Sequence, residues 1–305
     1  MKIMRTPETR FHNLSGYSFK PHYLRQDDGE GRVARIHYID EGPREGFPVL
    51  LLHGQPTYSF LYRKMVPFFV EEGFRVLAPD LLGFGRSDKP NDVAYYSIER
   101  HIRSMTSFVE TLGLRGVTLF CHDWGGFIGL CMAARLPDRF DRIVVCNTGL
   151  WSGEEKLNEA AKKWFAFTEQ HFPDLPIGEV IPMGMDTPSE ADVIAGYEAP
   201  FPDVSFKAGV AAFPRLFPRS GEDEGAHLSR AAWRVLSRWR KPFLTLFGKN
   251  DLLCGGYAEV FKAKVPGAEG QPHAKIDGGH FIQEENSEEL ARRTIEFIKA
   301  TEKHY

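Results

Sequence analysis

Several features that mark other classes of protein are scarce or missing in this chain of 305 residues. No apolar run reaches the roughly 18 residues that a transmembrane helix needs, and residues 1–23 contain no apolar segment typical of a signal peptide. The 38 lysines and arginines do not outnumber the 41 aspartates and glutamates, so nothing indicates a nucleic acid or an anionic membrane as partner. These absences favour a cytoplasmic protein.

Cysteine is also scarce. The four cysteines, Cys121, Cys131, Cys146 and Cys254, are scattered and form no C-x-x-C pair. Zinc sites and the disulfide frameworks of small secreted domains need closely spaced cysteines. We therefore expect reduced, mostly buried cysteines and no metal.

Strand and helix patterns alternate over most of the chain. Short apolar or alternating runs predict strands at residues 33–40, 48–52, 74–78, 117–120, 143–146, 242–247 and 273–276. Helical patterns occur at residues 59–72, 97–112, 127–135 and 288–302. Such alternation predicts an α/β fold with a mostly parallel central sheet, flanked by helices and joined by right-handed crossovers.

Residues 150–239 interrupt this alternation. They contain helical patterns and no convincing strand, and prolines punctuate them. The prolines are Pro173, Pro176, Pro182, Pro188, Pro200, Pro202, Pro214 and Pro218. We therefore predict a core of residues 1–149 and 240–305 and an inserted helical cap of residues 150–239. A cap can cover a pocket at the carboxyl ends of the strands.

The strongest chemical signal is the sequence CHDWGG at residues 121–126. It follows a predicted strand and precedes a predicted helix, which is the setting of a nucleophile elbow. In this tight turn one side chain rises above the sheet, and small neighbours let the backbone approach other segments closely. Enzymes of the α/β-hydrolase fold usually carry serine there, whereas this chain carries Asp123.

An aspartate changes the chemistry of the elbow. Serine must lose a proton before it attacks, but a carboxylate is already an anion near neutral pH. Asp123 can therefore displace a leaving group from saturated carbon and form an alkyl ester. A histidine is then needed only to activate the water that hydrolyses the ester. The structural alternative is an N-cap role, which is common for aspartate at a helix start.

Two more residues complete a predicted triad in the chain order nucleophile, acid, histidine. Asp251 follows the strand predicted at 242–247, and His280 follows the one at 273–276. We expect Asp251 to orient the ring of His280, and His280 to act as the general base. Asp277 is a rival for the acid, although its place in the sequence DGG is typical of a turn.

With these motifs the chain resembles the haloalkane dehalogenases. The likeness lies in HGQPTYSFLYRKM at 53–65, DLLGFGRSDKP at 80–90, the Asp123-Trp124 elbow and GGHF at 278–281, and it covers nearly the whole chain. The predicted acid, Asp251, has a position similar to that of the acid in the branch typified by the 1,2-dichloroethane-degrading enzymes. The resemblance implies a small apolar halogenated substrate, release of a halide ion, a role in detoxification and no cofactor.

In that branch two tryptophan N–H groups bind the departing halide, and the resemblance assigns this role to Trp124 and Trp164. An indole nitrogen donates a hydrogen bond, accepts none and adds no competing nucleophile. Trp164 can also be explained as part of a buried helical stripe. Three other tryptophans, Trp151, Trp233 and Trp239, are expected to pack the cap and its hinges. Three phenylalanines are candidate apolar walls of the pocket, although ordinary core packing is the favoured explanation for each: Phe127, Phe165 and Phe201.

The loop after residues 48–52 is expected to form an oxyanion hole. The backbone N–H groups of Gln55 and Trp124 would face the carbonyl oxygen of Asp123 during ester hydrolysis. The resembled branch usually has glutamate at the Gln55 position and other branches have asparagine, so the side chain of Gln55 departs from the pattern. Tyr58 likewise replaces the usual tryptophan.

Three other functions remain open from the sequence. An epoxide hydrolase also uses an elbow aspartate, but it needs cap tyrosines as acids, and residues 150–239 contain only Tyr197. A fluoroacetate-type dehalogenase needs cations near the nucleophile, where Gly125 and Gly126 stand. A hydrolase-fold binding protein often lacks a triad member, and this chain has all of them. The sequence carries no signal for an oligomer, and we expect a monomer.

Overall fold

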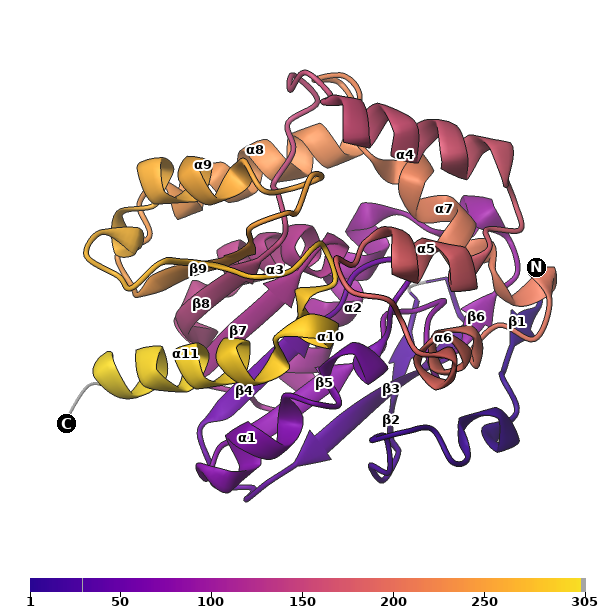
Figure 1. The fold of residues 1–305 in the computed structure, drawn as a ribbon, viewed down its shortest axis with the longest axis horizontal. Helices are drawn as coiled ribbons and strands as arrows, with labels where there is room; N and C mark the ends of the chain where they lie inside the picture. The colour runs from indigo at the N-terminus through magenta and orange to yellow at the C-terminus, as the bar shows by residue number, and fades with distance from the viewer. Residues whose placement is uncertain (29, 303–305) are drawn as a thin grey trace.

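The computed structural model describes residues 1–28 and 30–302. The strands are β1 (Ile3–Met4), β2 (His22–Asp27), β3 (Val33–Glu41), β4 (Pro48–Leu52), β5 (Arg75–Pro79), β6 (Lys89–Pro90), β7 (Val117–His122), β8 (Phe140–Cys146), β9 (Phe243–Gly248) and β10 (Ala274–Ile276). The central sheet has the order β10-β9-β8-β7-β4-β5-β3-β2 (Figure 1). Strands β10 to β5 pair in parallel, whereas β3 pairs antiparallel with β5 and β2 antiparallel with β3. The predicted mostly parallel sheet is confirmed.

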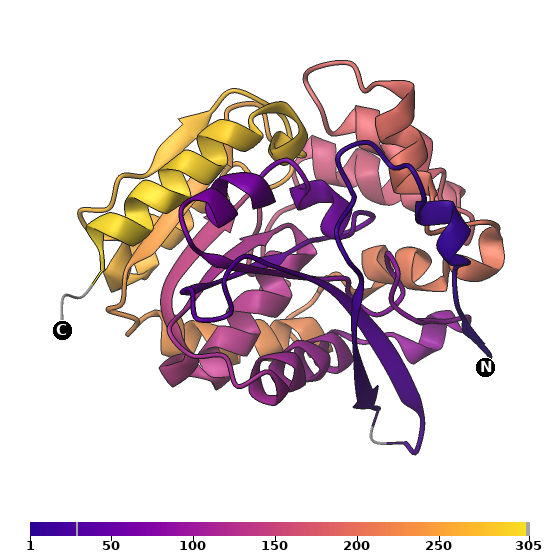
Figure 2. The same ribbon diagram turned by 90° about the horizontal axis from the view of Figure 1, so that it is seen from below.

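The α-helices are α1 (Val66–Glu71), α2 (Ile98–Thr111), α3 (Trp124–Arg135), α4 (Glu159–Gln170), α5 (Ile177–Met183), α6 (Ala191–Glu198), α7 (Ala208–Leu216), α8 (Glu224–Leu236), α9 (Tyr257–Lys264), α10 (Ile282–Glu285) and α11 (Ser287–Ala300). Short 3-10 helices occur at Glu8–Phe11, Ser59–Tyr62, Val93–Tyr95, Pro137–Arg139, Val204–Phe206 and Pro266–Ala268. Helices α1 and α11 pack together on one face of the sheet, and α2, α3 and α8 form a layer on the other (Figure 2). Within the described residues, no helix is both long and apolar enough to span a bilayer.

The central strands are buried on both faces because helices cover the sheet on both sides. Strands β4 and β7 are buried along nearly their whole length, which is why each stands out as a continuous apolar run. Strand β2 is an edge strand with mostly half-exposed residues, and no sequence pattern indicated it. The helix predicted at 59–72 is instead a 3-10 turn followed by α1, because Pro67 begins a new helix there.

All residues from 150 to 239 are described, and none lies in a strand. Helices α4 to α7 lie beyond the carboxyl ends of the strands, on the right of Figure 1. Helix α8 differs, because it packs on α3 and α2 through small residues that include Gly225, Ala226 and Ser229. The predicted boundary at residue 239 assigns α8 to the cap, whereas these contacts join it to helices of the core. We propose that the cap comprises α4 to α7 and that α8 belongs to the core.

Candidate active site

The elbow between β7 and α3 places Asp123 in a strained backbone conformation. Its φ of 51° and ψ of −128° are rare for a residue other than glycine. The turn is also tightly enclosed: a Cβ on Gly126 would lie 2.0 Å from Thr148 Oγ1, and one on Gly54 would lie 2.1 Å from Asp123 Oδ1. The carboxylate makes no N-cap hydrogen bond to the first turn of α3 of the kind that capping aspartates make to the second or third helical residue. The N-cap alternative therefore does not explain Asp123.

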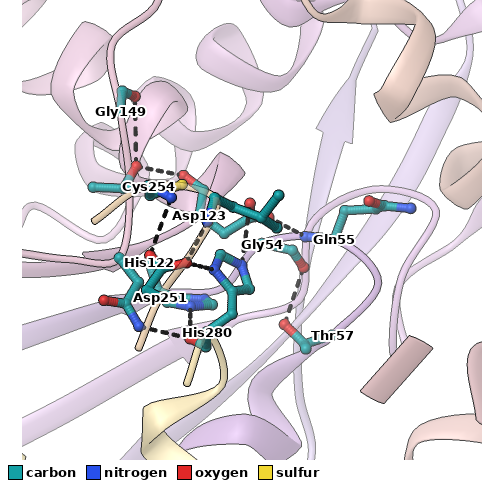
Figure 3. A network of polar contacts seen from close by, with 12 residues as sticks. Gly54, Gln55, Thr57, His122, Asp123, Gly149, Asp251, Cys254 and His280 are labelled. Atoms are coloured by element: carbon teal, nitrogen blue, oxygen red, sulfur yellow. Dashed lines mark hydrogen bonds and ion pairs between the residues drawn. The ribbon is translucent and has the colours of Figure 1, made fainter. Parts of the chain in front are cut away.

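His280 lies between the two predicted carboxylates (Figure 3). Its Nε2 is 3.6 Å from Asp123 Oδ2, and its Nδ1 is 3.1 Å from Asp251 Oδ1. The Asp123 side chain is 13% exposed, whereas that of Asp251 is 0% exposed. Only Asp123 is therefore open to a substrate. The rival acid, Asp277, is exposed and pairs with Lys249 at 2.7 Å.

Asp123, Asp251 and His280 stabilise the charged forms of one another. Burial by itself raises the pKa of Asp251, but His280 and the backbone amides of Cys254 and Leu253 outweigh burial and lower it. Burial by itself also raises the pKa of Asp123, and contacts with His280 likewise lower it. Burial lowers the pKa of His280, but the two carboxylates outweigh burial and raise it to about 10. The resting site is therefore an imidazolium between two carboxylates near neutral pH.

Backbone amides bind the Asp123 carboxylate on the side away from His280. The Gln55 N–H donates to Asp123 Oδ1 at 2.8 Å, and the Trp124 N–H also contacts this carboxylate. The loop that presents Gln55 is fixed by His53, whose Nδ1 contacts Gly54 O at 2.8 Å and whose Nε2 accepts from Leu81 N at 2.8 Å. Both amides predicted for the oxyanion hole thus meet the carboxylate.

The side chain of Gln55 points elsewhere. Its Nε2 donates to Val210 O in α7 at 3.3 Å, and Gln55 is not among the residues that line the main cavity. Glutamate could not donate this bond. The side-chain amide of Gln55 therefore contacts the cap helix α7 rather than the reacting atoms.

Two positioning residues were not predicted from the sequence. Asn147, directly after β8, donates through Nδ2 to Gly279 O and His280 O at 2.9 and 2.8 Å. Its Oδ1 accepts from Gly248 N at 2.7 Å, and its O accepts from Asp123 N at 3.1 Å. One residue thus connects the loops of all three triad members. The only sequence signal was its place at the carboxyl end of a strand.

Glu285 is the second positioning residue. Its Oε2 accepts from the N–H of Gly279 at 2.7 Å, beside His280. Its Oε1 accepts from the N–H groups of Asp186 and Thr187 at 2.8 Å each. This carboxylate therefore ties the histidine loop to the cap segment between α5 and α6.

A cavity of about 880 Å³ opens above Asp123, and Trp124 lines it too. Its apolar wall is formed by Leu150, Trp151, Leu157, Ala161, Trp164, Phe165, Pro214, Phe217, Trp233, Leu253, Tyr257 and Val260. Of the predicted phenylalanine walls, only Phe165 lines it; Phe127 and Phe201 are buried elsewhere in the core. The site therefore offers a largely apolar chamber with one carboxylate at its base.

The tryptophans differ in whether their indole N–H is free. Trp233 donates to Leu150 O at 3.1 Å, so its N–H is occupied. Among the described residues, no acceptor binds the indole N–H of Trp124, Trp164 or Trp151. Trp151 was expected only to pack a hinge, but it lines the cavity with its ring 5.6 Å from that of Trp124.

Tyr197, the acid that an epoxide hydrolase would need, is not in the cavity. Its side chain is fully buried, and its hydroxyl donates to Glu284 Oε1 at 2.6 Å. Arg63 binds the same carboxylate. The structure therefore gives Tyr197 a role in joining α6 to α10.

One group of possible metal ligands includes triad members. Ligand atoms of Asp251, Cys254 and His280 lie within 4.8 Å of one another. Burial raises the pKa of the Cys254 thiol well above its usual value, so the thiol stays protonated. The carboxylate of Asp251 already accepts bonds from His280 and two amides. This donor set fits triad support better than a metal.

Comparisons with known proteins agree with this geometry. Residues 48–287 match the family model of the alpha/beta hydrolase fold. A haloalkane dehalogenase of Psychrobacter cryohalolentis is 48% identical over 98% of this chain and 98% of its own length. One of Mycolicibacterium paratuberculosis is 46% identical over 98% and 99%. The solved tetrameric haloalkane dehalogenase DpaA of Paraglaciecola agarilytica superposes with a TM-score of 0.89 and 36% identity, covering 96% of this chain and 97% of that one.

The fold and the family model thus define an α/β hydrolase, and this one carries an aspartate at its elbow. Within that class, the chain belongs to the haloalkane dehalogenase family. It is an enzyme that hydrolyses carbon–halogen bonds in haloalkanes. The resemblance noted from the sequence and the predicted activity are both confirmed.

Proposed function

We propose that Asp123 carries the alkyl group during dehalogenation. Asp123 Oδ2 attacks the halogenated carbon, the carbon–halogen bond breaks, and the halide leaves with the bonding electrons. The observation that supports this most strongly is the placement of Asp123 at the base of an apolar cavity, between His280 and the amide of Gln55. Because Gln55 binds Oδ1, that oxygen becomes the carbonyl oxygen of the ester.

The departing halide is bound by the indole N–H groups of Trp124 and Trp164. Both residues line the cavity, and neither N–H has another acceptor among the described residues. Trp151 shares these two properties, so it is the rival for the second donor. Halide affinity, measured by fluorescence titration, should fall in Trp164→Phe and stay unchanged in Trp151→Phe; the reverse result would assign the donor to Trp151.

His280 then activates water for the second step. While Asp123 is charged, it and Asp251 raise the pKa of His280 against the effect of burial. Esterification removes the charge of Asp123, so the pKa of His280 falls and the imidazolium releases its proton to solvent. The neutral ring can then accept a proton from the attacking water. Water attacks the ester carbon, and the amides of Gln55 and Trp124 stabilise the oxyanion. Cleavage regenerates the Asp123 carboxylate and releases the alcohol.

The test is release of halide and protons from 1,2-dibromoethane and 1-bromobutane, with styrene oxide turnover measured beside it. Asp123→Ala provides the blank. Halide release that is absent in Asp123→Ala, without epoxide opening, supports the proposal. Halide release that continues in Asp123→Ala contradicts it.

We also propose that the chain needs no metal or organic cofactor and works in the cytoplasm as a monomer. All atoms of the reaction come from the haloalkane, water and the triad. A solved relative is described as tetrameric, so assembly needs its own measurement. Light scattering should give a mass near the 34.6 kDa of one chain, and a fourfold mass would contradict the monomer.

A further inference from the structure

The cavity is larger than a short haloalkane needs. Its volume of about 880 Å³ lies in the range of pockets that enclose drug-sized ligands, roughly 300–1,000 Å³. A haloalkane of two to four carbons contains only a few heavy atoms. Much of the cavity is therefore available to a longer chain whose halogenated end lies at Asp123.

One part of the cavity wall is built from a face of α8 and from α9. Helix α8 contributes Arg230, Trp233 and Arg234, residues three and four positions apart that share one helix face. Helix α9 contributes Lys264, whose Nζ lies 5.1 Å from the centre of the Trp233 ring. Lys156, in the segment before α4, also lines the cavity. Arg234, Lys264 and Lys156 are exposed, so this part of the cavity wall reaches solvent.

We call the four cations Arg230, Arg234, Lys264 and Lys156 the cationic rim of the cavity, and none of them has a carboxylate partner in the described part of the chain. Among the described residues, Arg230, Arg234, Lys264 and Lys156 form no ion pair, although Arg230 donates to Gly221 O at 2.5 Å.

The cavity lining also holds two carboxylates, those of Glu154 and Glu155. Glu155 is occupied, because it accepts bonds from Ser152 N, Gly153 N and the hydroxyl of Tyr257. Both carboxylates keep their charge, but four cations face two anions, so the rim has a local positive excess in a chain whose net charge is −3.

We propose that this enzyme prefers halogenated chains that carry a carboxylate at the opposite end. The halogenated carbon would lie at Asp123, the methylene chain along the apolar walls, and the carboxylate at the rim formed by Arg230, Arg234, Lys264 and Lys156. This inference rests on the proposed dehalogenase mechanism. Pairs between exposed charges are weak and screened by salt, so each cation should contribute about a two- to fivefold preference.

The experiment compares 6-bromohexanoate and 10-bromodecanoate with 6-bromohexanol and 10-bromodecanol, which are their uncharged counterparts. The value of kcat/KM for each is measured at low and high salt in the wild type and in the double variant Arg234→Glu/Lys264→Glu. The control variant is Arg238→Glu, which changes the net charge at an exposed position that does not line the cavity.

The wild type should prefer the acid over the alcohol of equal length, and salt should reduce this preference. The double variant should lower the acid-to-alcohol ratio at least fivefold and leave turnover of the alcohols unchanged, while Arg238→Glu keeps the wild-type ratio. A ratio that is unaffected by the double variant, or that falls equally in Arg238→Glu, overturns the proposal. Loss of activity on the alcohols in the wild type would instead contradict the dehalogenase mechanism itself.

Discussion

Replacement of Tyr197 by phenylalanine tests whether this cap tyrosine is structural or catalytic. Its hydroxyl donates to the buried carboxylate of Glu284 at 2.6 Å. Its ring packs against Phe60 with centroids 5.1 Å apart, a contact that phenylalanine preserves. The change therefore removes one hydrogen bond to a charged acceptor, which contributes about 1.5–3 kcal/mol.

The free energy of unfolding of Tyr197→Phe, measured by chemical denaturation, should fall by about 1.5–3 kcal/mol. The matched control is Tyr96→Phe, because Tyr96 is also buried but donates to a neutral acceptor, Pro90 O, at 2.8 Å. Its loss should be smaller, about 0.5–1.5 kcal/mol.

The value of kcat/KM for 1-bromobutane should stay within about twofold of the wild type in both variants, because neither hydroxyl lines the cavity. A Tyr197→Phe enzyme that keeps full stability but loses dehalogenation would refute this reasoning. It would show that the hydroxyl reaches the substrate, as the acid of an epoxide hydrolase does.

Three more perturbations follow from the site. Trp164→Phe should raise KM or the halide dissociation constant about tenfold, whereas Trp233→Phe, whose N–H is already occupied, should leave halide binding unchanged in a fluorescence titration. Glu285→Gln should slow ester hydrolysis more than alkylation in rapid-mixing experiments, because its carboxylate fixes the loop of His280; equal slowing of both steps would argue against this role. Because the folded pKa of His280 is raised to about 10, its stabilising effect should be complete below about pH 6.5 and be lost as the pH rises to about 10. The difference in Tm between the wild type and His280→Gln should shrink over that interval.

The sheet could be predicted, and the three triad candidates could be named, because their signals are local. A strand buried on both faces, such as β4, is a continuous apolar run, and the elbow places Asp123 between a strand and glycines. Asp251 and His280 follow strands whose carboxyl ends meet at one edge of a parallel sheet.

The remaining features depend on contacts between distant segments. Asn147 and Glu285 position the triad through bonds to other loops, and nothing in their own neighbourhoods indicates those partners. A helical pattern also does not reveal the helix on which α8 packs, here α3. The cationic rim could not be predicted either, because it exists only where α8 and α9 line the same cavity.

The most direct test of the mechanism is mass spectrometry of His280→Gln after mixing with 1,2-dibromoethane. This variant can form the ester but lacks the base that hydrolyses it. We expect one bromoethyl group on the peptide that contains Asp123, with about one bromide released per protein and no further turnover. Continued turnover without an adduct, or an adduct on another residue, would contradict the assignment of Asp123 as the nucleophile.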